Sequence, residues 1–231
     1  MSRIFITGDI HGATGINRFS STNFPDGREL TKNDYVIIAG DFGILWTNEP
    51  DKQEKYALKW LDNKPWTTLF VDGNHENHFR LNNLNTKEML GGTVGIVSSS
   101  VYHLKRGEIY TINDKTFFCF GGAYSWDIES RTIGISYWSE EIPNHAEMDH
   151  GLKNLETVQY SVDYVISHTV PISILEMIGF TKDPNKIDAT TKYLDHIANS
   201  ATYKRWFFGH MHIDRDFSKF RALYRDIEEI L

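Results

Sequence analysis

Five short apolar segments punctuate the sequence, and each ends abruptly at a glycine or a polar residue. They are RIFIT (3–7), YVIIA (35–39), TLFV (68–71), DYVIS (163–167) and KRWFF (204–208). The segments are rich in β-branched and aromatic residues and show no polar alternation, which is typical of strands buried on both faces. Strands of this kind need a covering layer on each side. We therefore predict an α/β fold.

The regions between these segments predict helices and hairpins. Apolar residues at helical spacing predict helices at 51–63, 144–158 and 185–200. Residues 94–122 break into strand-like pieces with a turn just before Lys115, and 213–227 predict a second hairpin that turns near Ser218. This mixture indicates two sheets packed between helices. No repeat or linker interrupts the chain, so we expect one domain over residues 1–231.

Polar side chains gather where the predicted strands end. In open α/β folds, ligands bind at the carboxyl ends of the strands. Those ends carry carboxylate, amide and imidazole groups at Asp9, His11, Asp41, Asn74, His75, His168, His210 and His212. Any one of them alone would be read as turn or capping chemistry. Together they are typical of a site for manganese, iron, zinc or nickel.

The spacing of these residues also bears on how they would bind. Asp9 and His11 are separated by one residue, as are His210 and His212. On an extended segment, such pairs project to the same side and could hold one ion from one direction. The set exceeds what one tetrahedral ion needs. Two ions about 3.5–4 Å apart, bridged by a carboxylate, would use all of the ligands.

Five short motifs occur in a characteristic order. They are GDIHG (8–12), GD (40–41), GNHE (73–76), SH (167–168) and GHMH (209–212). In this order they resemble the calcineurin-like metallophosphoesterases. The resemblance implies a four-layer α/β/β/α sandwich, in which two mixed sheets are flanked by helices. It also implies a dinuclear metal site.

The resemblance further implies a role for each motif residue. The first metal would be held by Asp9, His11 and His212, and the second by Asn74, His168 and His210. Asp41 would bridge the two metals and so belong to the catalytic centre. Asn74 and His75 would also contact substrate, and His75 would be the catalytic histidine that protonates the leaving alkoxide or stabilises the phosphoryl oxygens. Glu76 could orient that histidine or a ligand.

The implied chemistry is hydrolysis of a phosphate ester by in-line attack of a metal-bridging hydroxide. We expect a phosphomonoesterase, that is, a phosphatase, with manganese as the expected metal and iron, zinc or nickel as alternatives. The substrate would be a phosphorylated small molecule, a nucleotide or a phosphoprotein. A phosphodiesterase or a nucleotide pyrophosphohydrolase is the main alternative. A non-catalytic interaction module is disfavoured because every ligand and His75 are present.

The second motif departs from the pattern of the protein phosphatases. Their Gly-Asp-x-x-Asp-Arg-Gly is replaced here by GDFGILW, which puts Ile44 and Leu45 where the Asp–Arg pair would stand. This departure weighs against a protein substrate and leaves His75 without its expected partner. The segment GGAYSWDIESR (121–131) offers a replacement phosphate-binding group in Arg131. The alternative is that Arg131 is an ordinary solvated surface residue.

Composition limits the partners and the compartment. The net charge of −7 does not favour nucleic acid, and no apolar run approaches a membrane span. The one cysteine, Cys119, excludes an intramolecular disulfide and is expected to be a small buried apolar group. We therefore expect a cytoplasmic protein. We also expect His78 and His103 to be surface or partly buried residues, and Arg106 to lie on a solvated hairpin face.

Overall fold

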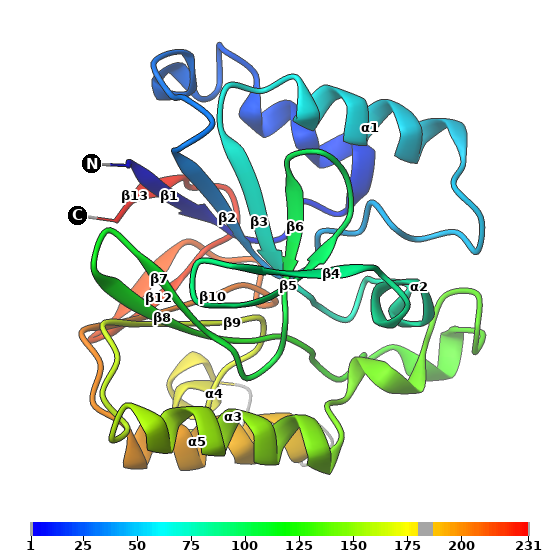
Figure 1. Cartoon of the computed structure of the whole chain (residues 1–231). Helices are drawn as coiled ribbons and strands as arrows, with labels where there is room; N and C mark the ends of the chain where they lie inside the picture. Colours follow the sequence, from blue (N-terminus) through cyan, green and yellow to red (C-terminus); the bar gives the residue numbers. More distant parts are fainter. Residues whose placement is uncertain (1, 180–186, 231) are drawn as a thin grey trace.

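Two β-sheets pack face to face, and helices cover the outer face of each (Figure 1). The computed structural model describes residues 2–179 and 187–230. In these residues the order of layers is helix, sheet, sheet, helix, with α1 on one outer face and α3, α4 and α5 on the other (Figure 1). The predicted α/β class and the four-layer sandwich of two mixed sheets are both confirmed.

The first sheet has seven strands in the described part of the chain, in the order β13-β1-β2-β3-β6-β5-β4. The bounds are β13 (Glu228–Glu229), β1 (Ile4–Thr7), β2 (Tyr35–Ala39), β3 (Thr67–Val71), β6 (Val101–Leu104), β5 (Gly92–Ile96) and β4 (Thr86–Met89). The four strands from β1 to β6 run parallel, and the outer ones pair antiparallel. Parallel pairing brings the carboxyl ends of β1, β2 and β3 to one edge.

The second sheet has six strands among the described residues, in the order β11-β12-β10-β9-β8-β7. The bounds are β11 (Arg215–Phe217), β12 (Phe220–Ala222), β10 (Arg205–Phe208), β9 (Tyr164–Ser167), β8 (Lys115–Phe120) and β7 (Ile109–Ile112). Both predicted hairpins are present, as β7–β8 and β11–β12. Ser218 adopts a left-handed φ of 57° at the predicted turn between β11 and β12.

The three longest helices begin at side chains that cap them. The bounds are α1 (Lys52–Asp62), α2 (His78–Asn82), α3 (His145–Thr157), α4 (Ile172–Ile178) and α5 (Ala189–Ser200), with 3₁₀ turns η1 (Gly12–Phe19), η2 (Pro25–Arg28), η3 (Ile128–Ser130) and η4 (Ser139–Glu141). Asp51, Asn144 and Asp188 each accept a backbone N–H at the start of α1, α3 and α5. The three predicted helices are confirmed, although residues 185 and 186 of the third lie outside the described residues.

Three apolar cores separate the four layers. Alternate residues of each strand enter different cores, so Ile37 of β2 packs between the sheets whereas Val36 and Ile38 pack under α1. The fully buried Cys119 lies between the sheets, as predicted. The third core lies between the second sheet and α3, α4 and α5. Burial on both faces explains why the strand segments of the sequence are apolar throughout.

No helix in the described residues has the length and apolarity needed to cross a membrane. The cytoplasmic location stays a prediction.

Candidate active site

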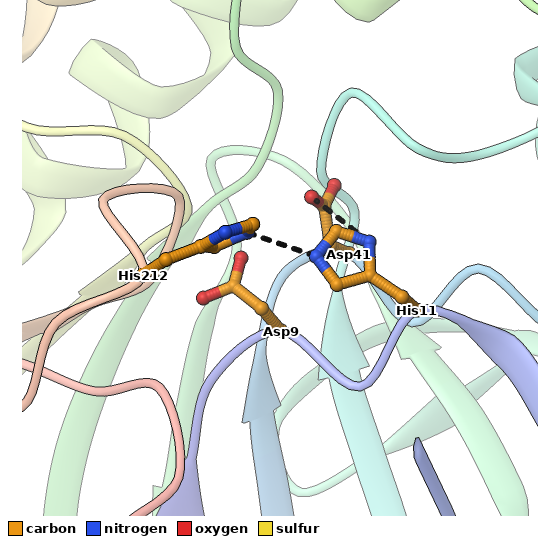
Figure 2. Close-up of side chains that lie close together, drawn as sticks. All are labelled: Asp9, His11, Asp41 and His212. Atoms are coloured by element: carbon orange, nitrogen blue, oxygen red, sulfur yellow. Dashed lines mark hydrogen bonds and ion pairs between the residues drawn. The ribbon is translucent and has the colours of Figure 1, made fainter. Parts of the chain in front are cut away.

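Four of the predicted metal ligands meet at the carboxyl edge of the strands. Asp9 and His11 follow β1, Asp41 follows β2, and His212 follows β10. Each offers a ligand atom, and these four atoms lie within 4.8 Å of one another. The Nε2 atoms of His11 and His212 are 2.9 Å apart, and Nδ1 of His11 lies 3.7 Å from Oδ2 of Asp41 (Figure 2). These are the residues predicted to hold the first metal together with the bridging Asp41.

The other predicted ligands form a second group that shares Asp41. Nε2 of His168 lies 3.2 Å from Oδ1 of Asp41 and 3.2 Å from Oδ1 of Asn74. The ring of His210 lies 4.9 Å from the ring of His168, measured between centroids. All seven predicted ligands are therefore brought to one place. Their division between two metals stays a prediction.

The backbone reaches this arrangement differently from our expectation for extended Asp-x-His and His-x-His pairs. His11, Asp41, His210 and His212 all adopt left-handed backbone conformations, with φ between 47° and 64°. Non-glycine residues rarely occupy this region, and such strain is concentrated at functional sites. The same-side argument from extended geometry was therefore wrong. The donors converge because each chain segment turns sharply directly after its strand.

Glycines make this close approach possible at two positions. Gly40 has a φ of +89°, and a Cβ atom there would lie 1.9 Å from Nδ1 of His168. A Cβ atom on Gly73 would lie 2.1 Å from Oδ1 of Asp41. Both distances are far below van der Waals contact, so the GD and GNHE motifs require glycine for steric reasons.

The buried carboxylates of Asp9 and Asp41 favour the binding of cations at the site. Burial raises the pKa of Asp9 to about 8. Burial opposes the charged form of His168 as well, but the carboxylates of Asp41 and Asp9 outweigh this effect and raise the pKa of His168 to about 9. Two fully buried carboxylates held this closely are costly without positive charge between them.

Three of the imidazoles are in a state that suits metal binding. Burial lowers the pKa of His11 to about 4 and also lowers the pKa values of His210 and His212, which leaves all three neutral at pH 7. Nδ1 of His168 lies 3.0 Å from the carbonyl oxygen of Ala39, which orients Nε2 toward Asp41 and Asn74. The donor set therefore fits two divalent cations with mixed oxygen and nitrogen ligands.

His75 is held from several sides, and no aspartate among the described residues is hydrogen-bonded to its ring. Its backbone N–H donates to Oδ1 of Asp41 at 2.8 Å, and its ring stacks on Trp46 with centroids 5.8 Å apart. Nη2 of Arg131 lies 3.1 Å from Nε2 of His75. Because Arg131 can only donate, the imidazole accepts this bond and its Nε2 carries no proton. Burial lowers the pKa of His75, Asp41 opposes that effect, and Arg131 adds to it.

Arg131 is not the solvated surface residue that the alternative reading described. Its side chain is 8% exposed, its Nε lies 2.7 Å from Oδ1 of Asp127, and its Nη1 donates to the carbonyl of Ser136. The position of the missing family aspartate, Ile44, is buried in the core under α1. The guanidinium therefore takes the place beside His75 that a carboxylate was expected to fill.

Glu76 holds the loop of a predicted ligand, which is one of the two roles that we expected for it. Its fully buried carboxylate accepts the N–H groups of Phe42 at 2.7 Å and Gly43 at 3.1 Å. It therefore holds the loop that carries Asp41 and makes no hydrogen bond to His75 in the described residues.

Behind the GNHE turn lies a buried polar cluster that sequence reasoning placed wrongly. His78, His103 and Arg106 are each at most 8% exposed, whereas we expected them at or near the surface. Nη2 of Arg106 lies 2.6 Å from Oδ2 of Asp72, and Nε2 of His103 lies 2.9 Å from Oδ1 of the same carboxylate. Nε2 of His78 lies 3.0 Å from the carbonyl of Gly73. The cluster is buried because Asp72 follows a central strand and needs partners.

Two hollows meet at His75. One, of about 360 Å³, is bordered by Asp41, Asn74 and His210 together with Arg131, and we call it the Arg131 hollow. The other, of about 280 Å³, is bordered by His11, Ile44 and Trp46 together with the start of α1, and we call it the Trp46 hollow. His75 lines both, so a group bound in one hollow would lie next to a group bound in the other.

The comparison with protein families covers this entire site. A family model described as calcineurin-like phosphoesterase matches residues 2–214, which includes every donor from Asp9 to His212. The chain belongs to the calcineurin-like phosphoesterase family. The matched residues of this calcineurin-like phosphoesterase include the candidate metal-binding cluster of Asp9, His11, Asp41 and His212.

Solved structures support the fold. The calcineurin-like phosphoesterase matches a Staphylococcus aureus protein described as a "Putative 5'-Nucleotidase", with a TM-score of 0.52 and 14% sequence identity. The match covers 98% of this chain but 50% of the other, so the chain spans about half the length of that protein. At this identity the likeness concerns the fold alone. No curated protein matches the sequence.

Proposed function

We propose that this calcineurin-like phosphoesterase is a phosphomonoesterase with a dinuclear metal site, and that manganese is its working metal. The observation that carries the proposal is that donors of both groups line one hollow together with His75 and Arg131. Asp9, His11 and His212 would hold one ion, Asn74, His168 and His210 the other, and Asp41 both. When bound, the two ions supply water activation and neutralise phosphoryl charge.

The residues of the chain then have distinct roles. The phosphoryl group enters the Arg131 hollow, where the guanidinium forms paired hydrogen bonds to its oxygens. This attraction draws Arg131 away from Nε2 of His75 and frees that atom to carry a proton. A water oxygen bonds to phosphorus and this water gives a proton to solvent, while the ester P–O bond breaks. His75, which has taken up a proton from solvent at Nε2, delivers that proton to the departing oxygen. The products are an alcohol and inorganic phosphate.

A monoester substrate is supported by the distribution of positive charge. Arg131 is the one lysine or arginine among the described residues that line the two hollows. A nucleotide pyrophosphohydrolase must hold further phosphate groups on its leaving group, and neither hollow offers a second cation for them. A small phosphorylated molecule such as a nucleoside monophosphate fits this charge pattern. A phosphodiesterase stays the main alternative because Ile44 and Leu45 replace the Asp–Arg pair.

The test compares 4-nitrophenyl phosphate with bis-(4-nitrophenyl) phosphate in the presence of manganese. We expect hydrolysis of both, with the monoester favoured in kcat/KM. A rate ratio that favours the diester would assign the protein as a phosphodiesterase. Absence of turnover on both esters with manganese, iron, zinc and nickel would refute the enzymatic proposal.

His75→Ala tests the assignment of the catalytic histidine. We expect the variant to bind two manganese ions and to lose roughly 10²–10⁴-fold in kcat, because general acid catalysis is worth that much. Metal content is measured by elemental analysis after dialysis. If the manganese content falls with the activity, His75 is a ligand and the assignment is wrong.

A further inference from the structure

The Trp46 hollow lies where the leaving group of the proposed reaction must go. In-line attack places the leaving oxygen opposite the attacking water, and His75 has to reach that oxygen to protonate it. His75 lines both hollows, whereas Arg131 lines only the one assigned to the phosphoryl group. The alcohol portion of the substrate therefore extends past His75 into the Trp46 hollow.

The walls of this hollow combine apolar and hydrogen-bonding surface. Ile44 and Trp46 supply apolar surface, and Thr14, Thr47 and Gln53 supply hydrogen-bonding groups. A ring or sugar-like body with hydroxyl or amino groups matches such walls. The volume of about 280 Å³ limits the occupant to a small molecule rather than a folded protein segment.

The charge of the walls is negative. Asp51 and Glu54 line the hollow, and no lysine or arginine is found among the described residues that do. The carboxylate of Glu54 is balanced by Arg80 at 2.7 Å, but that of Asp51 caps α1 by accepting the N–H of Glu54. This cap already uses the N-terminus of α1, so the helix offers no ready anion site there. A second phosphate in the hollow would face Asp51 without a counter-charge.

We propose that the Trp46 hollow is a leaving-group site that selects neutral or cationic alcohols and rejects anionic ones. This inference rests on the proposed monoesterase function. It narrows the substrate class to phosphate monoesters of uncharged or amine-bearing alcohols with a ring or polyol body. Nucleoside monophosphates belong to this class, and nucleoside di- and triphosphates do not.

The experiment uses phenyl phosphates that carry one para substituent, either hydroxymethyl, aminomethyl or carboxylate. We expect kcat/KM for the carboxylate ester to be about tenfold lower than for the neutral ester, as one like charge about 4 Å away would cause even in water. Gln53→Lys should shift that ratio about tenfold in favour of the carboxylate ester. Asp51→Asn keeps a capping side chain, removes the charge, and should shift the ratio the same way.

Gln159→Lys is the matched control, because it makes the same change at an exposed position beyond α3 and should leave the ratio unchanged. Each variant's ratio of kcat/KM for the carboxylate and neutral esters is compared with that of the wild type. The difference in intrinsic reactivity between the esters then cancels. If the esters are hydrolysed but the ratio is the same in wild type, Gln53→Lys and Asp51→Asn, the leaving-group site is refuted. If no ester is hydrolysed at all, the monoesterase function itself has failed.

A separate, fully buried hydrogen-bond chain ends at Asn74. The two carboxylate oxygens of Glu141 accept the backbone N–H of Ser125 at 2.6 Å and its hydroxyl at 2.8 Å. The Ser125 hydroxyl oxygen accepts Nδ2–H of Asn74 at 3.1 Å. The three residues are at most 4% exposed. Each therefore has to satisfy its hydrogen bonds within the protein.

The direction of this chain determines how Asn74 is oriented. With Glu141 ionised, its carboxylate can only accept, so the single hydroxyl proton of Ser125 goes to Glu141 and a lone pair of the hydroxyl oxygen faces Asn74. Only the NH₂ end of the amide can donate to that lone pair. The amide oxygen therefore points to the other side, where it lies 3.2 Å from Nε2 of His168. An amide turned the other way would present NH₂, which cannot bind a metal.

We infer that Ser125 and Glu141 are positioning residues that keep the oxygen of Asn74 directed at the second metal. Their action is through Asn74, and neither is placed in contact with the substrate. Outer groups of this type usually change metal affinity 10–100-fold when they are removed. The inference rests on the proposed ligand role of Asn74.

Calorimetric titration with manganese tests this inference. We expect Ser125→Ala to weaken the second ion about 10–100-fold and to leave the first unchanged. Glu141→Gln should weaken the same ion, because its amide can donate and turn the hydroxyl proton toward Asn74. Ser130→Ala, at an exposed position in the same loop, is the control and should bind as wild type.

Asn74→Asp separates orientation from general structural damage. A carboxylate presents oxygen in either orientation. Ser125→Ala should therefore reduce the affinity for the second manganese ion clearly less in the Asn74→Asp background than in the wild type. An equal cost in both backgrounds would show that Ser125 supports the fold only and would refute the inference. If the wild type binds only one ion, the dinuclear site is what has failed.

Discussion

At the residue scale, an arginine contacts the ring of His75, where an aspartate was expected. Ile44 stands where a carboxylate partner of His75 was expected, and the ring of His75 is instead fixed by Arg131 and by stacking on Trp46. A guanidinium differs from a carboxylate because it cannot stabilise an imidazolium. We therefore propose that it is shared between His75 at rest and the phosphoryl group during the reaction.

Arg131→Lys tests this sharing. Lysine has a compact head that cannot donate to His75 and to Asp127 at once. Loss of a charge-assisted hydrogen bond costs about 1.5–3 kcal/mol, so kcat/KM for 4-nitrophenyl phosphate should fall roughly 10–100-fold. The bound manganese should stay at the wild-type level.

Arg215→Lys, on an exposed strand, is the control for this change and should behave as wild type. Unchanged kcat/KM in Arg131→Lys would contradict a role for the guanidinium in substrate binding.

At the scale of elements, each sheet uses one aspartate to join the starts of two neighbouring strands. Asp34, just before β2, accepts the backbone N–H of Arg3 beside β1 at 2.6 Å. Asp163, just before β9, accepts the backbone N–H of Thr116 in β8 at 2.9 Å. These contacts set the register at the opposite end of the strands from the active site. They help to align the strand ends that carry the metal ligands.

The contribution of Asp34 should depend on pH. Burial raises the pKa of its carboxyl, but hydrogen bonds from the N–H groups of Arg3 and Thr31 outweigh burial and hold that pKa below its usual value. A depressed folded pKa adds stability above the unfolded pKa of about 4, and that stability is lost as the pH falls through the folded pKa. The stability difference between wild type and Asp34→Asn should therefore be largest above about pH 5 and should shrink below about pH 4.

The free energy of unfolding in urea, measured from pH 7 to pH 3, gives this difference directly. Asp149→Asn, on the exposed side of α3, controls for the removal of one carboxylate. If the difference in free energy of unfolding between wild type and Asp34→Asn grows as the pH falls, the prediction is wrong.

At the scale of the whole molecule, the site joins the two sheets. Asp9, Asp41 and Asn74 follow strands of the first sheet, whereas His168 and His210 follow strands of the second. Any cation that these residues hold together ties the sheets to each other. Metal binding and the stability of the fold should therefore be coupled.

Manganese should raise the melting temperature. An ion present at 100 times its Kd stabilises the folded state by about 2.7 kcal/mol, provided that it does not bind the unfolded chain. Thermal unfolding followed by circular dichroism, with manganese or with a chelator, measures the shift. The double variant Asp9→Asn/His168→Ala should show no rise in melting temperature with manganese. Equal melting temperatures with manganese and chelator in the wild type would contradict a metal site that spans the sheets.

We also propose that residues 1–231 form a single domain. Two sheets that share one apolar core and one site should unfold together. Calorimetry should therefore show one transition whose calorimetric and van't Hoff enthalpies agree. Two separate transitions would show that the sheets are independent units.

The sequence by itself was sufficient for the strand segments, the two hairpins, three of the five described α-helices and the gathering of polar side chains at the strand ends. These are local properties: burial on both faces makes a strand apolar along its length, and a ligand must follow the strand that carries it. The order of the motifs then indicated the family. Nothing beyond short segments of chain was needed for these conclusions.

Only the tertiary structure decided which distant groups meet. Arg131 reaches His75 across 56 positions, and Arg106 reaches Asp72 across 34, so neither contact leaves a local pattern. Glu141 was not identified from the sequence for the same reason, since its partner Ser125 comes from another loop. Apolar periodicity records which face of an element is buried, but it does not record which polar groups close packing brings together. That pairing depends on how the two sheets and their loops stack.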